Sequence, residues 1–259
     1  MRQVEERYIS LLTDFGFKRI FGTAINKDLL ICFLNSLFAG KQVVKDVSYL
    51  NPEHVGDVYT DRKAIFDVYC EGENGEKFIV EMQNAYQTYF KDRSLFYSTF
   101  PIREQAALLN FDMNEEAFEK EKIRHSVQLC DTATHKVFYD KLEFIYVEIA
   151  KFNKSLEELE TLYDKWLYAL KNLYKLTQRP KELCDKVFDR LFEEAEIAKF
   201  TPQELREYEA SKIAYRDIKN SVDTAKREGI AEGMEKKSHE IAKKMLTKGM
   251  DEATVMEIT

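Results

Sequence analysis

Apolar and polar positions alternate most regularly between residues 63 and 83, in two runs that flank the turn-forming residues 73–75 (Glu-Asn-Gly). This pattern predicts a β-hairpin. A two-residue Asn-Gly turn would pair Val68 with Glu81 and mix apolar and charged side chains on each face. A three-residue loop with Gly75 in the left-handed conformation pairs positions that sum to 148 and sorts the two faces, because a one-residue slip turns every side chain over. We therefore predict the three-residue loop.

This register places two carboxylates opposite each other. Asp67 faces Glu81 on one side of the hairpin, whereas Phe66 faces Met82 on the other. Directly opposite residues have Cβ atoms about 4.5–5.5 Å apart, so paired carboxylates repel each other and destabilise the sheet. A cation between them would remove the conflict. In the alternative reading, both carboxylates lie on an open face and a nearby Lys or Arg neutralises them.

Strand alternation adds Gln83 to the face that carries Asp67 and Glu81. Magnesium prefers oxygen ligands, keeps several waters and is typically held by one or two carboxylates. Asp67 and Glu81 supply that minimum. Gln83 is neutral, so it can hold the attacking water or a phosphate oxygen without competing for the metal. The spacing by itself also arises by chance in many chains.

Helical spacing dominates the start of the chain. Thr13 or Asp14 can cap a helix over 15–21, and Asn26 can cap a longer apolar helix over 27–38. The remaining segments of the first half are expected to be mainly strands, with one helix over 90–100 and an apolar run of either type over 106–111. The predicted strands are 43–50, 126–131 and 143–149.

From Ser155 onward the pattern is helical throughout. Ser155 and Glu158 have the spacing of a capping box, and a stripe of Leu and Trp that is typical of core follows. A second helix is expected over 181–199. A third begins at Pro202, behind another capping box, and its glycines are expected to break it. These glycines are Gly229, Gly233 and Gly249.

Composition limits the class of protein. The chain has 259 residues, of which 44% are hydrophobic and 33% charged, with 9 Gly and 4 Pro, as in a helix-rich globular protein. A net charge of −7 argues against a protein that coats nucleic acid by charge alone, but it allows a local basic groove. The four cysteines lie far apart and are read as reduced thiols. No signal peptide and no apolar run of about 20 residues is found, so we expect a cytoplasmic protein without a membrane segment.

Other chemistries find no support in the motifs. The four histidines have no zinc-site spacing, and the sequence contains no P-loop, dinucleotide-binding glycine pattern or nucleophile elbow. The lysine pairs 236–237 and 243–244 are balanced in sequence by Glu235 and Glu240. We read them as a solvated helix face.

Separate blocks along nearly the whole chain share the spacing of one known family. The blocks are 13–22, 30–37, 63–68, 80–83, the helix block with Arg93, Tyr97 and Gln105, and the later blocks 151–154, 165–167 and 171–172. Through them the chain resembles the recombination-promoting nuclease (Rpn) family, also described as PD-(D/E)XK nuclease family transposases.

The resemblance implies an α/β (α+β) fold. We expect a PD-(D/E)XK restriction-endonuclease-like core over 1–154, with a mixed central sheet flanked by helices, and an α-helical C-terminal region over 155–259. Relative to the family the core is shortened near 105–112. The helix after the third strand should therefore have little room to deliver a fourth strand. Relatives also continue past Thr259 into another short helix.

The resemblance also implies a function, which is Mg²⁺-dependent cleavage of DNA phosphodiesters by metal-activated water, with Mn²⁺ as a substitute. Asp67 and Glu81 would bind the metal, and Gln83 would complete the catalytic set. The wider superfamily has lysine at that last position.

Gln83 lacks the positive charge of that lysine, and Lys18 or Lys63 could supply it in space. Arg93 and Tyr97 would support the site. Two alternatives stay open: a catalytically impaired DNA-binding or scaffold protein that keeps the fold, and a nuclease that acts on RNA. The helical C-terminal region offers a surface for homo-oligomers.

Overall fold

The computed structural model of the chain describes residues 6–38, 40–50, 53–54, 64–65, 67–85, 104–113 and 118–258. Its contacts divide the chain into two compact units, Met1–Tyr215 and Arg216–Thr259.

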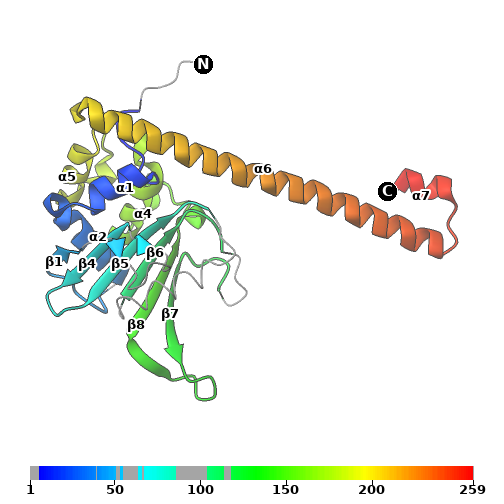
Figure 1. Cartoon of the computed structure of the whole chain (residues 1–259), viewed down its shortest axis with the longest axis horizontal. Coiled ribbons are helices and arrows are strands. Elements are labelled where there is room, and N and C mark those ends of the chain that lie inside the picture. The colour runs from blue at the N-terminus through cyan, green and yellow to red at the C-terminus, as the bar shows by residue number, and fades with distance from the viewer. Residues whose placement is uncertain are drawn as a thin grey trace. The chain divides into compact units, whose positions relative to one another are not determined.

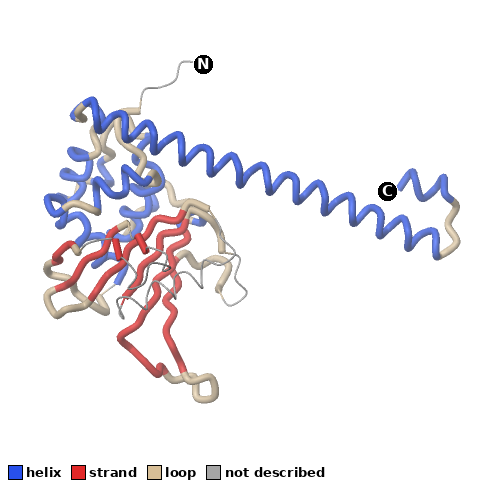
Figure 2. The backbone as a smooth tube through the Cα atoms, viewed as in Figure 1, coloured by secondary structure: helices blue, strands red, loops and turns tan. Residues whose placement is uncertain are grey.

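A mixed six-stranded sheet forms the centre of the first unit (Figures 1 and 2). The spatial order is β1-β4-β5-β6-β8-β7, in which β5, β6 and β8 run parallel and the other neighbours pair antiparallel. The strands are β1 Val47–Tyr49, β4 Val68–Gly72, β5 Lys77–Gln83, β6 Glu104–Leu109, β7 Arg124–Cys130 and β8 Val137–Glu148. A separate two-stranded pair consists of β2 Glu53–His54 and β3 Ala64–Ile65.

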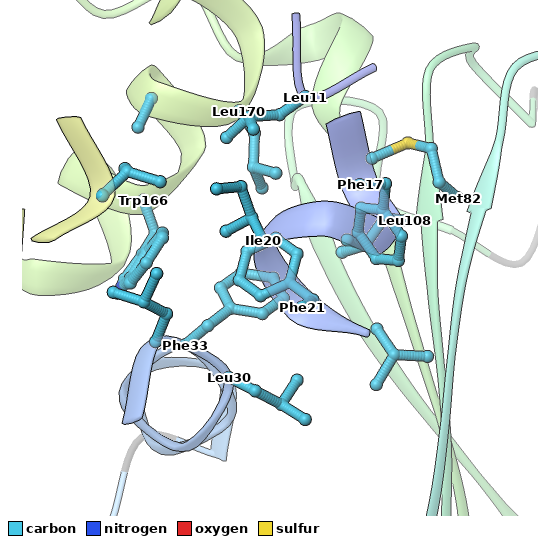
Figure 3. Packing of buried hydrophobic residues seen from close by; sticks show 14 of the residues in the cluster. Leu11, Phe17, Ile20, Phe21, Leu30, Phe33, Met82, Leu108, Trp166 and Leu170 are labelled. Atoms are coloured by element: carbon cyan, nitrogen blue, oxygen red, sulfur yellow. The ribbon is translucent and has the colours of Figure 1, made fainter. Parts of the chain in front are cut away.

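Helices cover one face of this sheet and share a large apolar core with it. In Figure 3, Phe17 and Phe21 of α1 lie between Trp166 of α4 and the strand residues Met82 and Leu108. The described α-helices of the first unit are α1 Asp14–Phe21, α2 Lys27–Phe38, α4 Leu162–Asn172, α5 Lys186–Glu194 and the beginning of α6 Pro202–Thr247. The short 3-10 helices are η1 Ala24–Asn26, η2 Ile149–Lys151, η3 Leu156–Glu158, η4 Leu173–Lys175, η5 Lys181–Leu183 and η6 Ile197–Lys199.

The first two predicted helices form where their sequence signals lie. Thr13 caps α1, since its side chain accepts a hydrogen bond from the Gly16 N–H at 3.1 Å. Both α1 and α2 bury their apolar stripes completely, including Phe17, Phe21 and Phe33. The mixed sheet, its flanking helices and the helical C-terminal region confirm the predicted fold class.

The predicted hairpin register is also confirmed. The pairs between β4 and β5 include Val68 with Val80 and Cys70 with Phe78, and each sums to 148. The loop has three residues, and Gly75 adopts a φ of 80°, where an L side chain would be strained.

The fourth strand of the core shows that one expectation was wrong. The shortened segment near 105–112 was expected to leave little room for this strand, yet β6 pairs parallel with β5 along its full length. Gln105, which we had assigned to the preceding helix block, lies in β6. A parallel partner requires a crossover of about a dozen residues, and the 20 residues between Gln83 and Glu104 satisfy that need.

Other boundaries differ because local hydrogen bonds compete with the expected element. The strand predicted over 43–50 shortens to β1, since the Asn35 amide bonds both the N–H and the C=O of Val44 at 2.7 and 2.8 Å. The Ser155 capping box closes only η3. The α-helix starts later, at a second capping box made by Thr161 and Asp164.

Two further helical expectations were wrong. The helix expected over 181–199 is divided into η5, α5 and η6, because Ala195 ends α5 and Glu196 forms a β-bridge with Tyr8. The long helix α6 runs through Gly229 and Gly233 without a break. Glycine in an exposed helix costs only about 1 kcal/mol relative to Ala, and helix-forming neighbours offset that cost.

The second unit comprises the rest of α6 and the short helix α7 Glu252–Ile258. The chain leaves α6 through Gly249, whose φ is 83°. Val255 is the only residue between 216 and 258 that the structure describes as buried. Helices α4 and α5 belong to the first unit, and the domain boundary after residue 154 stays a prediction.

No single helix among the described residues is long and apolar enough to cross a membrane. Taken together, α1 and residues 24–38 have the length and apolar composition of a membrane span, but the pair is bent by 64°. The apolar side chains of that pair form the centre of the core.

Candidate functional site

The two faces of the sheet differ sharply in chemistry along β5. Phe78, Val80 and Met82 point into the helix-covered core, whereas Ile79 belongs to a small separate cluster on the opposite face. Strand alternation puts Glu81 and Gln83 on that opposite face as well. Glu81 is only 5% exposed, so β5 buries a carboxylate on the face opposite the large core.

Asp67 lies at a bend directly before β4, at the position that would pair next with Glu81. Its Oδ2 accepts a hydrogen bond from the backbone N–H of Met82 at 2.8 Å, and its side chain is 23% exposed. The hydrogen bond holds the Asp67 carboxylate against β5 at the residue that follows Glu81. Asp67 and Glu81 are therefore neighbours across the hairpin.

Lys18 brings a cation from α1 to this carboxylate. Its Nζ lies 3.8 Å from Asp67 Oδ1 and 2.7 Å from Asp14 Oδ1. Burial works to lower the pKa of Lys18, but hydrogen bonds and charge attraction from Asp14 and Asp67 raise it above its ordinary value. The ammonium group is thus held in its charged form. Lys18 also lines a groove of about 730 Å³ between α1 and the first turns of α6.

Gln83 ends β5 beside the start of the next loop. The Gln83 side-chain Nε2 donates to the Ala85 carbonyl at 3.1 Å. The Gln83 backbone carbonyl accepts from the Asn110 N–H at 2.9 Å. The neighbouring Asn84 donates to the Leu12 carbonyl at 3.0 Å. These bonds fix the end of β5 to the segments that flank it.

The donor set fits a hard divalent cation. Asp67 and Glu81 offer carboxylate oxygens, which suits an ion that keeps several waters and needs one or two protein carboxylates. Within the described ranges, no group of three or more His, Cys, Asp or Glu side chains could hold a metal, so a site closed by protein ligands is not formed there. Among the other predicted site residues, Lys63, Arg93 and Tyr97 lie outside the described residues.

One buried polar cluster escaped the sequence reading. Glu148, at the end of β8, is fully buried and uses both oxygens: Oε1 accepts from the Met113 N–H at 2.6 Å, and Oε2 accepts from Lys151 Nζ at 2.8 Å. His125 Nε2 lies 3.0 Å from the same Oε2. An acid at the end of the apolar run 143–149 was the available signal.

This cluster lies on the same sheet face and edge as the candidate site. The parallel registers align Gln83 with Leu109 and Leu109 with Glu148. Glu148 therefore sits two strands away from Gln83, at the common C-terminal edge of β5, β6 and β8. The segment between Asn110 and Met113 is bonded to β5 at one end and to Glu148 at the other.

Comparison with known families supports the same reading. The chain matches the family described as PD-(D/E)XK nuclease family transposase over residues 11–225. Residues 235–259 match the C-terminal HTH domain of the Rpn/YhgA-like nuclease family. Searches of curated proteins and of solved structures give no match. Because the first match spans most of the sequence and agrees with the observed sheet, the chain belongs to the PD-(D/E)XK nuclease family of transposases.

Proposed function

We propose that the chain is a Mg²⁺-dependent DNA endonuclease whose active site is built on the β4–β5 hairpin. The observation that carries this proposal is the bond from the Met82 N–H to Asp67 Oδ2, which holds the Asp67 carboxylate against β5 at the residue after the buried Glu81. Two neighbouring carboxylates repel unless a cation lies between them. Membership of a nuclease family supports phosphodiester cleavage as the reaction, and Asp67 and Glu81 are the proposed metal ligands.

Each residue has a separate role in this proposal. Asp67 and Glu81 bind the divalent ion, and Gln83 orients water or a phosphate oxygen through its amide. Lys18 contributes the positive charge that the wider superfamily places at position 83, since its Nζ already lies within 4 Å of Asp67. A bound divalent ion supplies Lewis-acid stabilisation of the phosphate and activation of water. Mn²⁺ has the same ligand preference and is expected to substitute.

Plasmid nicking tests the proposal directly. In 5 mM Mg²⁺, Asp67→Asn and Glu81→Gln should each reduce the nicking rate at least about 100-fold, since partners that merely support a metal ligand already cost about 10–100-fold. Glu71→Gln is the matched control, because Glu71 lies on the same hairpin but pairs with Lys77. It should retain wild-type activity. Equal nicking by all four proteins would reveal a contaminating nuclease and defeat the assignment.

Melting curves provide a readout that does not depend on turnover. A ligand of the native state raises stability by mass action, so Mg²⁺ or Mn²⁺ should raise the Tm of the wild type and of Glu71→Gln. The Tm of Asp67→Asn and Glu81→Gln should respond less. The absence of any shift at millimolar metal would count against an organised site.

A non-catalytic DNA-binding protein is the second candidate. It is favoured by the engagement of Asp67 with both Met82 and Lys18, which already compensates part of its charge. The shortened middle segment no longer supports it, because β6 is fully paired. Tight DNA binding with no Mg²⁺-dependent nicking would favour this second function. A comparison of DNA with RNA substrates would test the remaining alternative, a nuclease that acts on RNA.

A further inference from the structure

The last turns of α6 and the helix α7 carry opposite charges. Between residues 236 and 248 the sequence has five lysines and one glutamate, whereas α7 and its cap contain no Lys or Arg. The acidic residues there are Asp251, Glu252 and Glu257. The segment that matches an HTH domain is therefore basic in its first half and acidic in its second.

The basic half has two distinct faces. Between 216 and 247, Ser238, Ala242 and Met245 are half-buried, and every other residue is exposed. Spacings of four and three residues put them on one side of the helix. Val255 of α7 is 4% exposed, and these three residues mark the side of α6 with reduced exposure in the second unit.

The lysines occupy the opposite side. At 100° per residue, Lys236, Lys237, Lys243 and Lys244 fall within an arc of about 120°, centred roughly opposite Ala242 and Met245. Lys236 pairs with Glu232. Lys237, Lys243 and Lys244 form no ion pair with a carboxylate whose side chain the structure describes. Neither Glu235 nor Glu240, which were expected to balance these lysines, forms an ion pair with them, so three charges of the lysine face have no ion-pair partner among the described side chains.

The N-terminus of α7 is closed to a phosphate by its own cap. The Thr254 N–H donates to Asp251 Oδ1 at 3.0 Å, and the Thr254 hydroxyl donates to Asp251 Oδ2 at 2.7 Å. These bonds lower the pKa of Asp251 below its ordinary value, so the cap stays anionic. An anionic cap and Glu252 repel a phosphate group where a helix start would otherwise attract one.

We propose that the lysine face of α6, formed by Lys236, Lys237, Lys243 and Lys244, contacts the phosphates of duplex DNA, and that α7 does not. The inference rests on DNA as the partner in the proposed function and deepens it by naming the surface. Lysines that neutralise phosphates release condensed counterions, which makes binding fall linearly with salt on a logarithmic scale. Three free lysines correspond to a slope contribution of about 2.7.

The test is DNA affinity as a function of salt, measured in EDTA so that no cleavage occurs. Fluorescence anisotropy with a 30-base-pair duplex would compare the full chain with the triple variant Lys237→Gln, Lys243→Gln, Lys244→Gln. The variant should lower the slope of log affinity against log salt by about 2–3. The matched control replaces three exposed cations of the same helix, Arg216, Lys219 and Lys226, by Gln. Its slope should stay at the wild-type value.

Three outcomes would overturn the inference. One is an unchanged slope in the lysine-face variant, and another is an equal loss in the control variant. The third is that the lysine-face variant loses binding to anionic phospholipid vesicles while its affinity for the DNA duplex stays at the wild-type value. The result is separable from the cleavage proposal, because Asp67→Asn should keep the full salt slope. If the protein shows no nicking activity, the predicted salt slopes of DNA binding can still be observed.

Discussion

The two faces of the central sheet follow different rules. On the helix-covered face, every described β5 side chain is apolar and belongs to the large core with Phe17 and Trp166. On the opposite face, carboxylates lie among apolar clusters, with Glu81 on β5 and Glu148 on β8 both buried. The first face stabilises the fold through apolar area. The second face holds groups whose burial costs free energy unless partners compensate them.

This difference separates residues that fix the fold from residues that the fold holds for chemistry. A buried charge with several hydrogen bonds, such as Glu148, anchors chain segments. A buried acidic residue whose neighbour across the hairpin is also acidic, as at Glu81 and Asp67, is a ligand in the proposed site. The distinction predicts that variants on the two faces differ in the size and in the metal dependence of their effects.

The largest effect is expected on the helix-covered face, at Trp166. Its ring contacts those of Phe21, Phe33 and Phe188 and is fully buried. Trp166→Ala should lower the free energy of unfolding by about 3–5 kcal/mol, through lost burial and the cavity left behind. Urea unfolding followed by circular dichroism measures it. A loss below about 1 kcal/mol would show that this core is not the main source of stability.

A smaller effect is expected for the anchor on the opposite face. Glu148→Ala removes the acceptor of the Met113 N–H, of Lys151 and of His125 and should cost about 3 kcal/mol, independent of metal. Glu143→Ala is the control, because that side chain on the same strand is only half-buried and accepts a hydrogen bond from the Ser126 hydroxyl. The same urea titration applies. Equal costs for the two variants would remove the distinction between anchor and surface on this strand.

The smallest effect is expected at Glu81. Glu81→Gln keeps the side-chain size and removes a buried charge, so without metal the free energy of unfolding should change by less than about 1 kcal/mol, or rise. With Mg²⁺, only the wild type should gain stability. A large metal-independent loss would place Glu81 with Glu148 among the anchors instead of the ligands.

Sequence patterns predicted those parts of the fold that depend on local chemistry. Period-two alternation and the loop residues 73–75 were sufficient for the hairpin register, since a slip would have buried charges in the core. Caps at Thr13 and Thr201 located the starts of α1 and α6. The family resemblance then predicted the fold class, and the family match with the observed sheet confirms both the family and the fold class.

What the sequence could not predict depends on distant partners. The bond from the Met82 N–H to Asp67 exists only because the chain bends at Asp67 instead of continuing the ladder. The Glu148 carboxylate is hydrogen-bonded to His125 and to the Met113 N–H, which lie 23 and 35 positions away in the sequence. No local sequence pattern predicts such distant partners. The length of β8 was underestimated for the same reason, because its first residues are exposed and pair only with β7.

Helix α6 is one element with two thermodynamic regimes. Its first turns contribute Tyr208 to the core, and the Tyr208 hydroxyl accepts from the Ser10 N–H at 2.9 Å. From 216 to 237 every residue is exposed. In hydrogen–deuterium exchange, amides near Tyr208 should therefore exchange only when the whole domain opens, while those a few turns later exchange through local fraying. Protection against hydrogen exchange should therefore fall steeply along α6, although its backbone geometry is uniformly helical.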